Sequence, residues 1–171
     1  MRWLAGLLLN FCTMPKSYDG NSMKKKLVIV GVIAILGLYL MSMSASMPNN
    51  IGVSDGKLSP LPDSPNAVST QADDSERRMK PLEIDGANNE NMDRLVEIIK
   101  NWPRTKIVQQ TDNYLHVEFA SLIFRFVDDV EFYLDQSAGQ IHFRSASRVG
   151  HSDMGVNRRR MAAIAEKWDS N

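Results

Sequence analysis

Two segments in the second half of the chain repeat apolar residues every three or four positions, which is the spacing of one helical face. The apolar positions are Met92, Leu95, Val96 and Ile99 in the first segment, and Met161, Ile164, Ala165 and Trp168 in the second. Pro103 ends the first pattern, because proline interrupts helical hydrogen bonding, and Asp153 is placed to cap the second. We therefore expect helices from about residue 91 to 102 and from about 154 to 168.

Between these helices the apolar period changes to two, as in a strand with one buried face. The pattern covers four segments, 106–111, 114–120, 122–135 and 141–147. Asp112-Asn113 and residues 136–139 have the composition of turns. An antiparallel β-meander of about four strands, packed with an N-terminal and a C-terminal helix, makes an α+β domain of two layers.

The first third of the chain has a different pattern. Lys24-Lys25-Lys26 precede an unbroken apolar run from Leu27 to Met41, and no charged residue follows until Asp55. A basic stretch before an apolar one is typical of a signal segment, and Leu27 to Met47 is also long enough to span a hydrocarbon core of roughly 30 Å. A cleaved signal peptide and an uncleaved single-pass anchor both stay open, and the anchor is favoured because no A-x-A cleavage motif is well formed.

These patterns divide the chain into four parts. Residues 1–22 fit no element and Met23 is a natural start, so we interpret 1–22 as an over-extended start. Residues 23–47 are the signal anchor or signal peptide, and the proline-rich segment 48–60 is a flexible tether. Residues 61–171 form the single α+β domain. The positive-inside rule places that domain on the non-cytoplasmic, periplasmic side of the cell membrane, or free in the periplasm after cleavage.

Charge and cysteine content exclude several classes of protein. The formal net charge is zero, but the part from Met47 onward has 15 basic against 19 acidic residues, a net charge of −4. This mildly acidic domain disfavours nucleic-acid binding, which needs a basic field over a whole face. The single cysteine, Cys12, excludes an intrachain disulfide framework and a cysteine-based metal site.

Asp128 interrupts the apolar face of the long strand segment, between Phe126 and Val130. An ionised carboxylate there would cost several kcal/mol without a partner. Three interpretations are open. A β-bulge at Asp128-Asp129 re-aims the side chain toward water, an arginine from a neighbouring strand or helix pairs with it, or Asp128-Asp129 is a turn that divides the strand.

The stretch from Arg144 to Arg160 contains five arginines where the last strand meets the last helix. Hairpin geometry and the helical stripe predict one polar cluster at this end of the sheet, and we expect Arg159 and Arg160 to face solvent. The predicted ligand-binding candidates are Arg144, Ser145, Ser147, Arg148, His151, Asn157 and Arg158, and the predicted ion-pair candidates are Asp128, Asp129, Glu131 and Asp153. The cluster is either a satisfied ion-pair network that holds helix to sheet or a pocket for an anion.

Signals for catalysis are weak. Ser145 and Ser147 have no convincing base nearby, and His116, His142 and His151 are too scattered for a triad. Asp128, Asp129, Glu131 and Asp153 offer oxygen ligands to a hard cation, but the neighbouring arginines compete for the same oxygens. We therefore predict no catalytic residue, no metal and no cofactor.

Three blocks of the sequence are Ser64-Pro65-Asn66-Ala67-Val68-Ser69, Phe124 to Phe132, and Arg144 to Arg160. Together they resemble the domain of unknown function 1499 family of bacterial envelope and chloroplast-related proteins. The resemblance covers about residues 58–168, makes residues 61–69 part of the folded unit, and implies an anchored or lipidated envelope domain without an established activity. Many relatives carry a cysteine on each side of the Ser-Pro-Asn motif. Leu61 and Ala67 stand at those places, so this loop must be fixed by packing.

We therefore expect a non-catalytic domain of the cell envelope that binds an envelope protein or an anionic small ligand through its arginine-rich end. A purely structural module is one alternative. The other is a metal-assisted or hydrolase-like enzyme that uses Asp128, Asp129, His151 and Asp153.

Overall fold

The computed structural model describes residues 20–43, 46–85 and 88–170, and the chain divides into two units, 1–37 and 38–171. Helix α1 (Gly20–Met43) carries the three lysines and the apolar run, and its side chains from 21 to 40 are exposed. Within the described residues, no helix combines the length and the apolar character needed to cross a membrane. Cys12 and most of the expected over-extended start, up to residue 19, lie outside the described residues.

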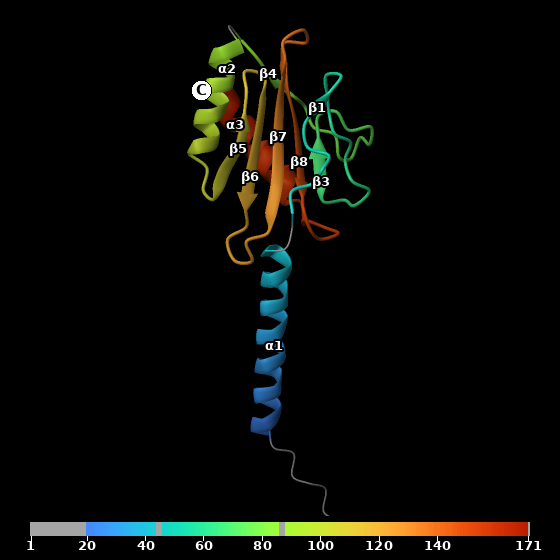
Figure 1. The fold of residues 1–171 in the computed structure, drawn as a ribbon, viewed down its shortest axis with the longest axis vertical. Coiled ribbons are helices and arrows are strands. Elements are labelled where there is room, and N and C mark those ends of the chain that lie inside the picture. The colour runs from blue at the N-terminus through green and yellow to red at the C-terminus, as the bar shows by residue number, and fades with distance from the viewer. Residues whose placement is uncertain (1–19, 44–45, 86–87, 171) are drawn as a thin grey trace, which may run out of the picture. The chain divides into compact units, whose positions relative to one another are not determined.

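The second unit is an α+β domain built on one antiparallel sheet (Figure 1). Its strands are β3 (Ala67–Ser69), β4 (Leu82–Glu83), β5 (Thr105–Gln110), β6 (Tyr114–Ala120), β7 (Val127–Asp135) and β8 (Gln140–Ser147). The strand order is β3-β8-β7-β6-β5, and β4 also pairs with β8. The predicted meander of four strands, β5 to β8, is confirmed, and two short strands extend it along β8.

The predicted helices are α2 (Asn88–Lys100) and α3 (Val156–Ser170). The predicted apolar positions of α2 are all buried, and so are Met161, Ile164 and Trp168 of α3. Both helices cover the face of the sheet formed by alternate apolar residues of β6, β7 and β8. Trp168 closes this core, since its indole Nε1 donates to the carbonyl of Glu83 at 2.8 Å and Arg94 stacks on its ring.

One strand prediction is wrong at its start. Residues 122–126 do not belong to β7, which begins at Val127. They form a tight loop in which Ser121 N donates to Phe126 O at 2.8 Å, and Arg125 has a φ of 58°. A left-handed residue ends strand pairing, so the alternation of Leu122, Phe124 and Phe126 does not continue the buried face.

The Ser-Pro-Asn segment is folded onto the domain as the resemblance implies. Val68 is buried, and β3 pairs antiparallel with the end of β8, with Ala67 opposite Ala146. Asn66 Nδ2 donates to the carbonyl of Gly150 at 2.6 Å, and Asn66 O accepts a bond from Asn157 Nδ2 at 2.9 Å. These long-range bonds join the first family block to the last without a disulfide.

Part of the expected tether is structured. The hairpin of β1 (Val53–Ser54) and β2 (Lys57–Leu58) lies on the sheet face opposite the helices, because it contacts Glu131 and Tyr133, which alternate with the core-facing residues of β7. Gly52 N donates to Glu131 Oε1 at 2.7 Å, and a Cβ on Gly56 would lie 3.8 Å from Tyr133 Oη. The contacts of the folded domain therefore begin by Gly52 and not at residue 61.

Candidate functional site

The predicted polar cluster exists as two clusters on opposite faces of the sheet. Adjacent residues of a strand point to opposite faces, so Asp128 of β7 lies on the helix face and Asp129 on the face that carries the β1–β2 hairpin. The hairpin-face cluster consists of Tyr114, His116, Glu118, Asp129, Glu131, Arg144 and Arg148. The helix-face cluster consists of Asp128, Ser145, Ser147, Asn157 and Arg160.

In the hairpin-face cluster, Arg148 binds two acids. Its Nε donates to Asp129 Oδ2 at 2.8 Å and its Nη2 to Asp129 Oδ1 at 2.7 Å, a two-pronged contact that suits the planar guanidinium. The same Nη2 lies 2.6 Å from Glu118 Oε1. His116 Nε2 is 2.7 Å from Asp129 Oδ1, and both side chains are 1% exposed. This group is a closed ionic network between β6, β7 and the end of β8.

Glu131 lies at the centre of the other half of the hairpin-face cluster. It is opposite Arg144 in the β7–β8 register, and Arg144 Nη1 donates to Glu131 Oε2 at 3.0 Å. Glu131 Oε1 accepts bonds from Tyr114 Oη at 2.8 Å and from Gly52 N at 2.7 Å. Arg144 Nε is buried and has no hydrogen-bond partner within the described residues. The hydrogen bonds from these three partners compensate for the burial of the Glu131 carboxylate within the sheet.

The cluster shifts the pKa of its members in opposite directions. Burial raises the pKa of Asp129, but the hydrogen bonds from Arg148 and His116 outweigh burial, so that pKa lies below its usual range. The hydrogen bonds that Arg148 donates to Asp129 raise the pKa of Arg148. Burial and the negative charge of Glu131 raise the pKa of Tyr114. The hairpin face therefore holds Asp129 ionised and Tyr114 protonated across the neutral pH range.

In the helix-face cluster, Arg160 of α3 reaches down to the sheet. Its Nη2 donates to Asp128 Oδ2 at 2.5 Å, its Nη1 donates to Asn157 Oδ1 at 2.8 Å, and its guanidinium lies 4.7 Å from the Phe119 ring centroid. Ser145 Oγ donates to Asn157 Oδ1 at 2.5 Å. Of the three interpretations of Asp128, pairing with an arginine is confirmed. The bulge and the turn are wrong, because β7 pairs with both neighbours without a register shift at this point.

The prediction that Arg159 faces solvent is confirmed, but the predictions for Arg158 and Arg160 are wrong. Arg158 is exposed and donates to the carbonyl of Glu76, whereas Arg160, expected in solvent, makes the ion pair. Both arginines lie three or four residues from a buried position of α3, Arg158 from Met161 and Arg160 from Ile164, so the helical period alone does not separate them.

The remaining predicted residues lie at the end of β8 and in the loop before α3. Asp153 caps the helix as predicted, since its Oδ2 accepts a bond from Asn157 N at 2.7 Å and its Oδ1 from Gly155 N at 2.9 Å. His151 is exposed. Ser147 Oγ accepts a bond from Asn157 Nδ2 at 3.0 Å, so Ser145 and Ser147 both serve the contact between β8 and α3.

The residues of the enzyme alternative do not meet. Asp128 and Asp129 occupy opposite faces, and Asp153 is used as a helix cap. Within the described part of the chain, no group of three or more His, Cys, Asp or Glu side chains is arranged to hold a metal ion. The alternation of strand faces is the physical reason that these acids are separated.

A cleft of about 360 Å³ opens where α3 begins, beside the helix-face cluster. Its lining includes Trp102, Pro103, Arg104, Phe119, Ala120, Ser121, Asp128, Val156, Arg159, Arg160 and Ala163. We call it the arginine cleft, because three guanidinium groups and a single carboxylate, that of Asp128, line it. Arg104 donates from Nε to the carbonyl of Ala120 at 3.1 Å, and Arg159 donates from Nη1 to the carbonyl of Met154 at 2.8 Å. No pattern in the sequence identifies Arg104, which only the packing of the α2–β5 turn brings here.

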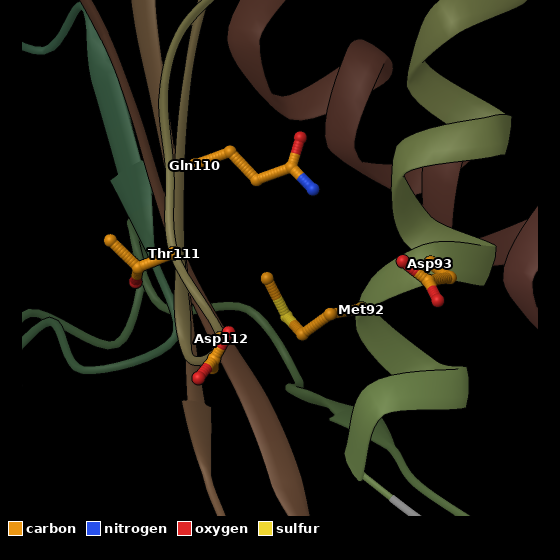
Figure 2. A pocket seen from close by; sticks show the side chains of 5 residues that line it. All are labelled: Met92, Asp93, Gln110, Thr111 and Asp112. Carbon is orange, nitrogen blue, oxygen red and sulfur yellow. The ribbon is translucent and has the colours of Figure 1, made fainter.

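A second cleft, also of about 360 Å³, lies between the start of α2 and the β5–β6 turn. Figure 2 shows Gln110 projecting from the strand end toward α2 and Met92 projecting from α2 toward the strands, with Asp112 at the turn. The lining offers carboxylates and an amide but no cationic side chain. Its polarity is opposite to that of the arginine cleft, so the two clefts would select ligands of opposite charge.

The model of the family described as "Protein of unknown function (DUF1499)" matches residues 57–167, which run from β2 almost to the end of α3. No curated protein and no solved structure matches the chain. The matched region contains both polar clusters and the arginine cleft.

Proposed function

The chain belongs to the DUF1499 family, and from this premise we propose that it is a membrane-anchored, non-catalytic binding module of the cell envelope that holds an anionic group in the arginine cleft. The proposal has two parts, an anchor and an anion site. They rest on different observations and are tested separately.

The charge balance of the arginine cleft carries the anion site. Asp128, its single carboxylate, is already paired with Arg160. Arg104 and Arg159 are exposed, and the hydrogen bonds described for their guanidinium groups go to backbone carbonyls. Two positive charges in one small cleft repel each other unless an anion lies between them, and a guanidinium that leaves donors free can bind phosphate or carboxylate with two bonds.

The start of α3 strengthens this interpretation. The first turn of α3 has no acidic residue, although three successive arginines, Arg158, Arg159 and Arg160, lie near it. Cations near a helix N-terminus are unfavourable because the helix dipole is positive there, and the same dipole favours a bound anion. Asp153 supplies one carboxylate there as the helix cap, so three arginines stand against one acid at this helix start.

Inorganic phosphate is a direct probe of the anion site. We expect phosphate to raise the melting temperature of the purified full chain, because a ligand that binds only the folded state stabilises it. Arg104→Ala combined with Arg159→Ala should abolish the increase, and both positions are exposed, so the fold should persist. Arg78→Ala is the matched control, since Arg78 is also exposed but binds the carbonyl of Ala72, outside the cleft. Equal increases in all three proteins would refute the anion site.

The anchor rests on Lys24-Lys25-Lys26 followed by the apolar residues from Leu27 toward Met47. The large apolar side chains of α1 from Leu27 to Leu40 are exposed, and such side chains are unfavourable in water. The positive-inside rule then puts the folded domain on the periplasmic side. We expect the full chain to stay in the membrane pellet after alkaline carbonate extraction and to keep its uncleaved size on a blot. Release into the supernatant would refute the anchor.

A further inference from the structure

Two loops beside the arginine cleft expose large apolar side chains. Leu122 and Ile123 of the β6–β7 loop are 69% and 73% exposed, and Met154 of the β8–α3 loop is 86% exposed. Ser121 and Val156, which flank these residues, both line the cleft, so the two loops border the same opening. Exposed apolar side chains that gather at one place usually mark a contact surface.

Hydrogen bonds hold both loops in defined turns. Phe126 N donates to Ser121 Oγ at 2.9 Å, and the Phe124 and Phe126 rings lie 5.7 Å apart. Met154 has a φ of 54° and is followed by Gly155 with a φ of 75°, immediately before the capped helix. Met154 N also donates to Ser152 Oγ at 3.3 Å. The apolar side chains are therefore presented outward by the turns themselves.

The exposed charged side chains of these two segments are arginines. Residues 121–126 contain Arg125 and no acid, and Arg125 is exposed. In residues 148–160, Arg148 and Arg160 are paired with carboxylates of the sheet and Asp153 caps α3, whereas Arg158 and Arg159 are exposed. Arg104 adds a further exposed cation from the α2–β5 turn. Apolar tips surrounded by arginines complement an anionic bilayer surface, where apolar groups enter the interface and arginines bind phosphate.

We propose that this end of the domain docks on an anionic lipid bilayer. Leu122, Ile123 and Met154 enter the interface, and the arginine cleft takes the phosphate of a lipid headgroup. The proposal rests on the anion site of the proposed function and names its ligand. A bilayer can accommodate two separate protruding turns, because lipids adapt to the tips of loops. Each arginine near an anionic surface also strengthens binding by roughly fivefold.

An environment-sensitive dye on Ile123→Cys, in a Cys12→Ser background of the full chain, tests the docking. We expect a blue shift, and quenching by a quencher placed on the lipid chains, with vesicles that contain phosphatidylglycerol, and a much smaller response with phosphatidylcholine alone. Ala138→Cys is the control, because Ala138 is exposed in the β7–β8 turn, at the other end of β7 from the β6–β7 loop. Arg104→Ala with Arg159→Ala should weaken the Ile123 response by an order of magnitude or more, and Arg78→Ala should not change it.

Several results would overturn the docking. An Ile123 dye that behaves like the Ala138 dye refutes it, and so does a response that survives the loss of Arg104 and Arg159. If dissolved phosphate stabilises the chain but the dye does not respond to vesicles, the anion site stands and its ligand is a free anion. If the dye shifts with protein concentration in the absence of lipid, the tips contact a second copy of the chain instead.

Discussion

The two polar regions of this domain differ in how completely their charges are satisfied. On the hairpin face, Asp129, Glu131 and Arg144 are buried and paired within the sheet. At the arginine cleft, Arg104 and Arg159 are exposed and donate to backbone carbonyls. The same arginine-rich stretch, 144–160, contributes to both regions. Arginine content alone therefore does not reveal function, and the pairing of each guanidinium separates a structural role from a binding role.

The largest effect is expected from Arg148→Ala. The change leaves Asp129 buried without its two-pronged partner, and we expect the free energy of unfolding to fall by about 3–5 kcal/mol. Chemical denaturation of the full chain measures this loss. Arg148→Lys keeps the charge but not the planar fork, so it should lie between wild type and alanine. A loss below about 1 kcal/mol would mean that the hairpin-face cluster does not stabilise the fold.

A smaller loss is expected from Arg160→Met. It leaves Asp128 without its partner at a site where each side chain is 11% exposed, and we expect about 1–3 kcal/mol. Asp128→Asn should restore part of this stability in the double variant, because the orphaned charge is removed. A double-mutant cycle by denaturation gives the coupling energy. Strictly additive losses would show that the ion pair between α3 and β7 has no net effect.

Acid should weaken the domain through Asp129. Its pKa is lowered in the folded state, so the unfolded state takes up a proton first as pH falls. The stabilisation is complete well above the unfolded pKa of about 3.9 and is lost as pH falls through the folded value, at up to about 1.4 kcal/mol per pH unit. The free energy of unfolding, measured by denaturation at several pH values between neutral and pH 3, should fall less steeply with pH for Asp129→Asn than for wild type. An equal dependence of the unfolding free energy on pH in the two proteins would mean that other carboxylates cause the acid sensitivity.

The smallest effect is expected from Arg158→Ala. The side chain is exposed and donates to the carbonyl of Glu76, so stability should change by no more than about 0.5 kcal/mol. This variant contrasts with Arg160→Met two residues further on. If denaturation shows a similar loss for both, the assignment of the two arginines to solvent and to sheet is wrong.

Much of the fold was predictable because it depends on local periods. The spacing of Met161, Ile164 and Trp168 located α3, and the alternation from Tyr114 to Ala120 matched β6 in full. The error at residues 122–126 arose where alternation continued past the point at which Arg125 turns the backbone. Burial of the hairpin face was not predictable, since nothing in β6 or β7 indicates that the β1–β2 hairpin covers them.

The candidate site was predictable in composition and not in pairing. Asp128, Glu131, Arg144, Arg148 and Asn157 were expected to be polar cluster members, and each has a polar partner. The sequence alone predicts which residue types gather at this end of the sheet, because strand order and turn length bring them there, and strand alternation separates Asp128 from Asp129. The folded structure is needed to show that Arg160 and not Arg158 neutralises Asp128, and that Arg104 joins the cleft. Both outcomes depend on contacts between distant segments, which neither the strand period nor the helical period specifies.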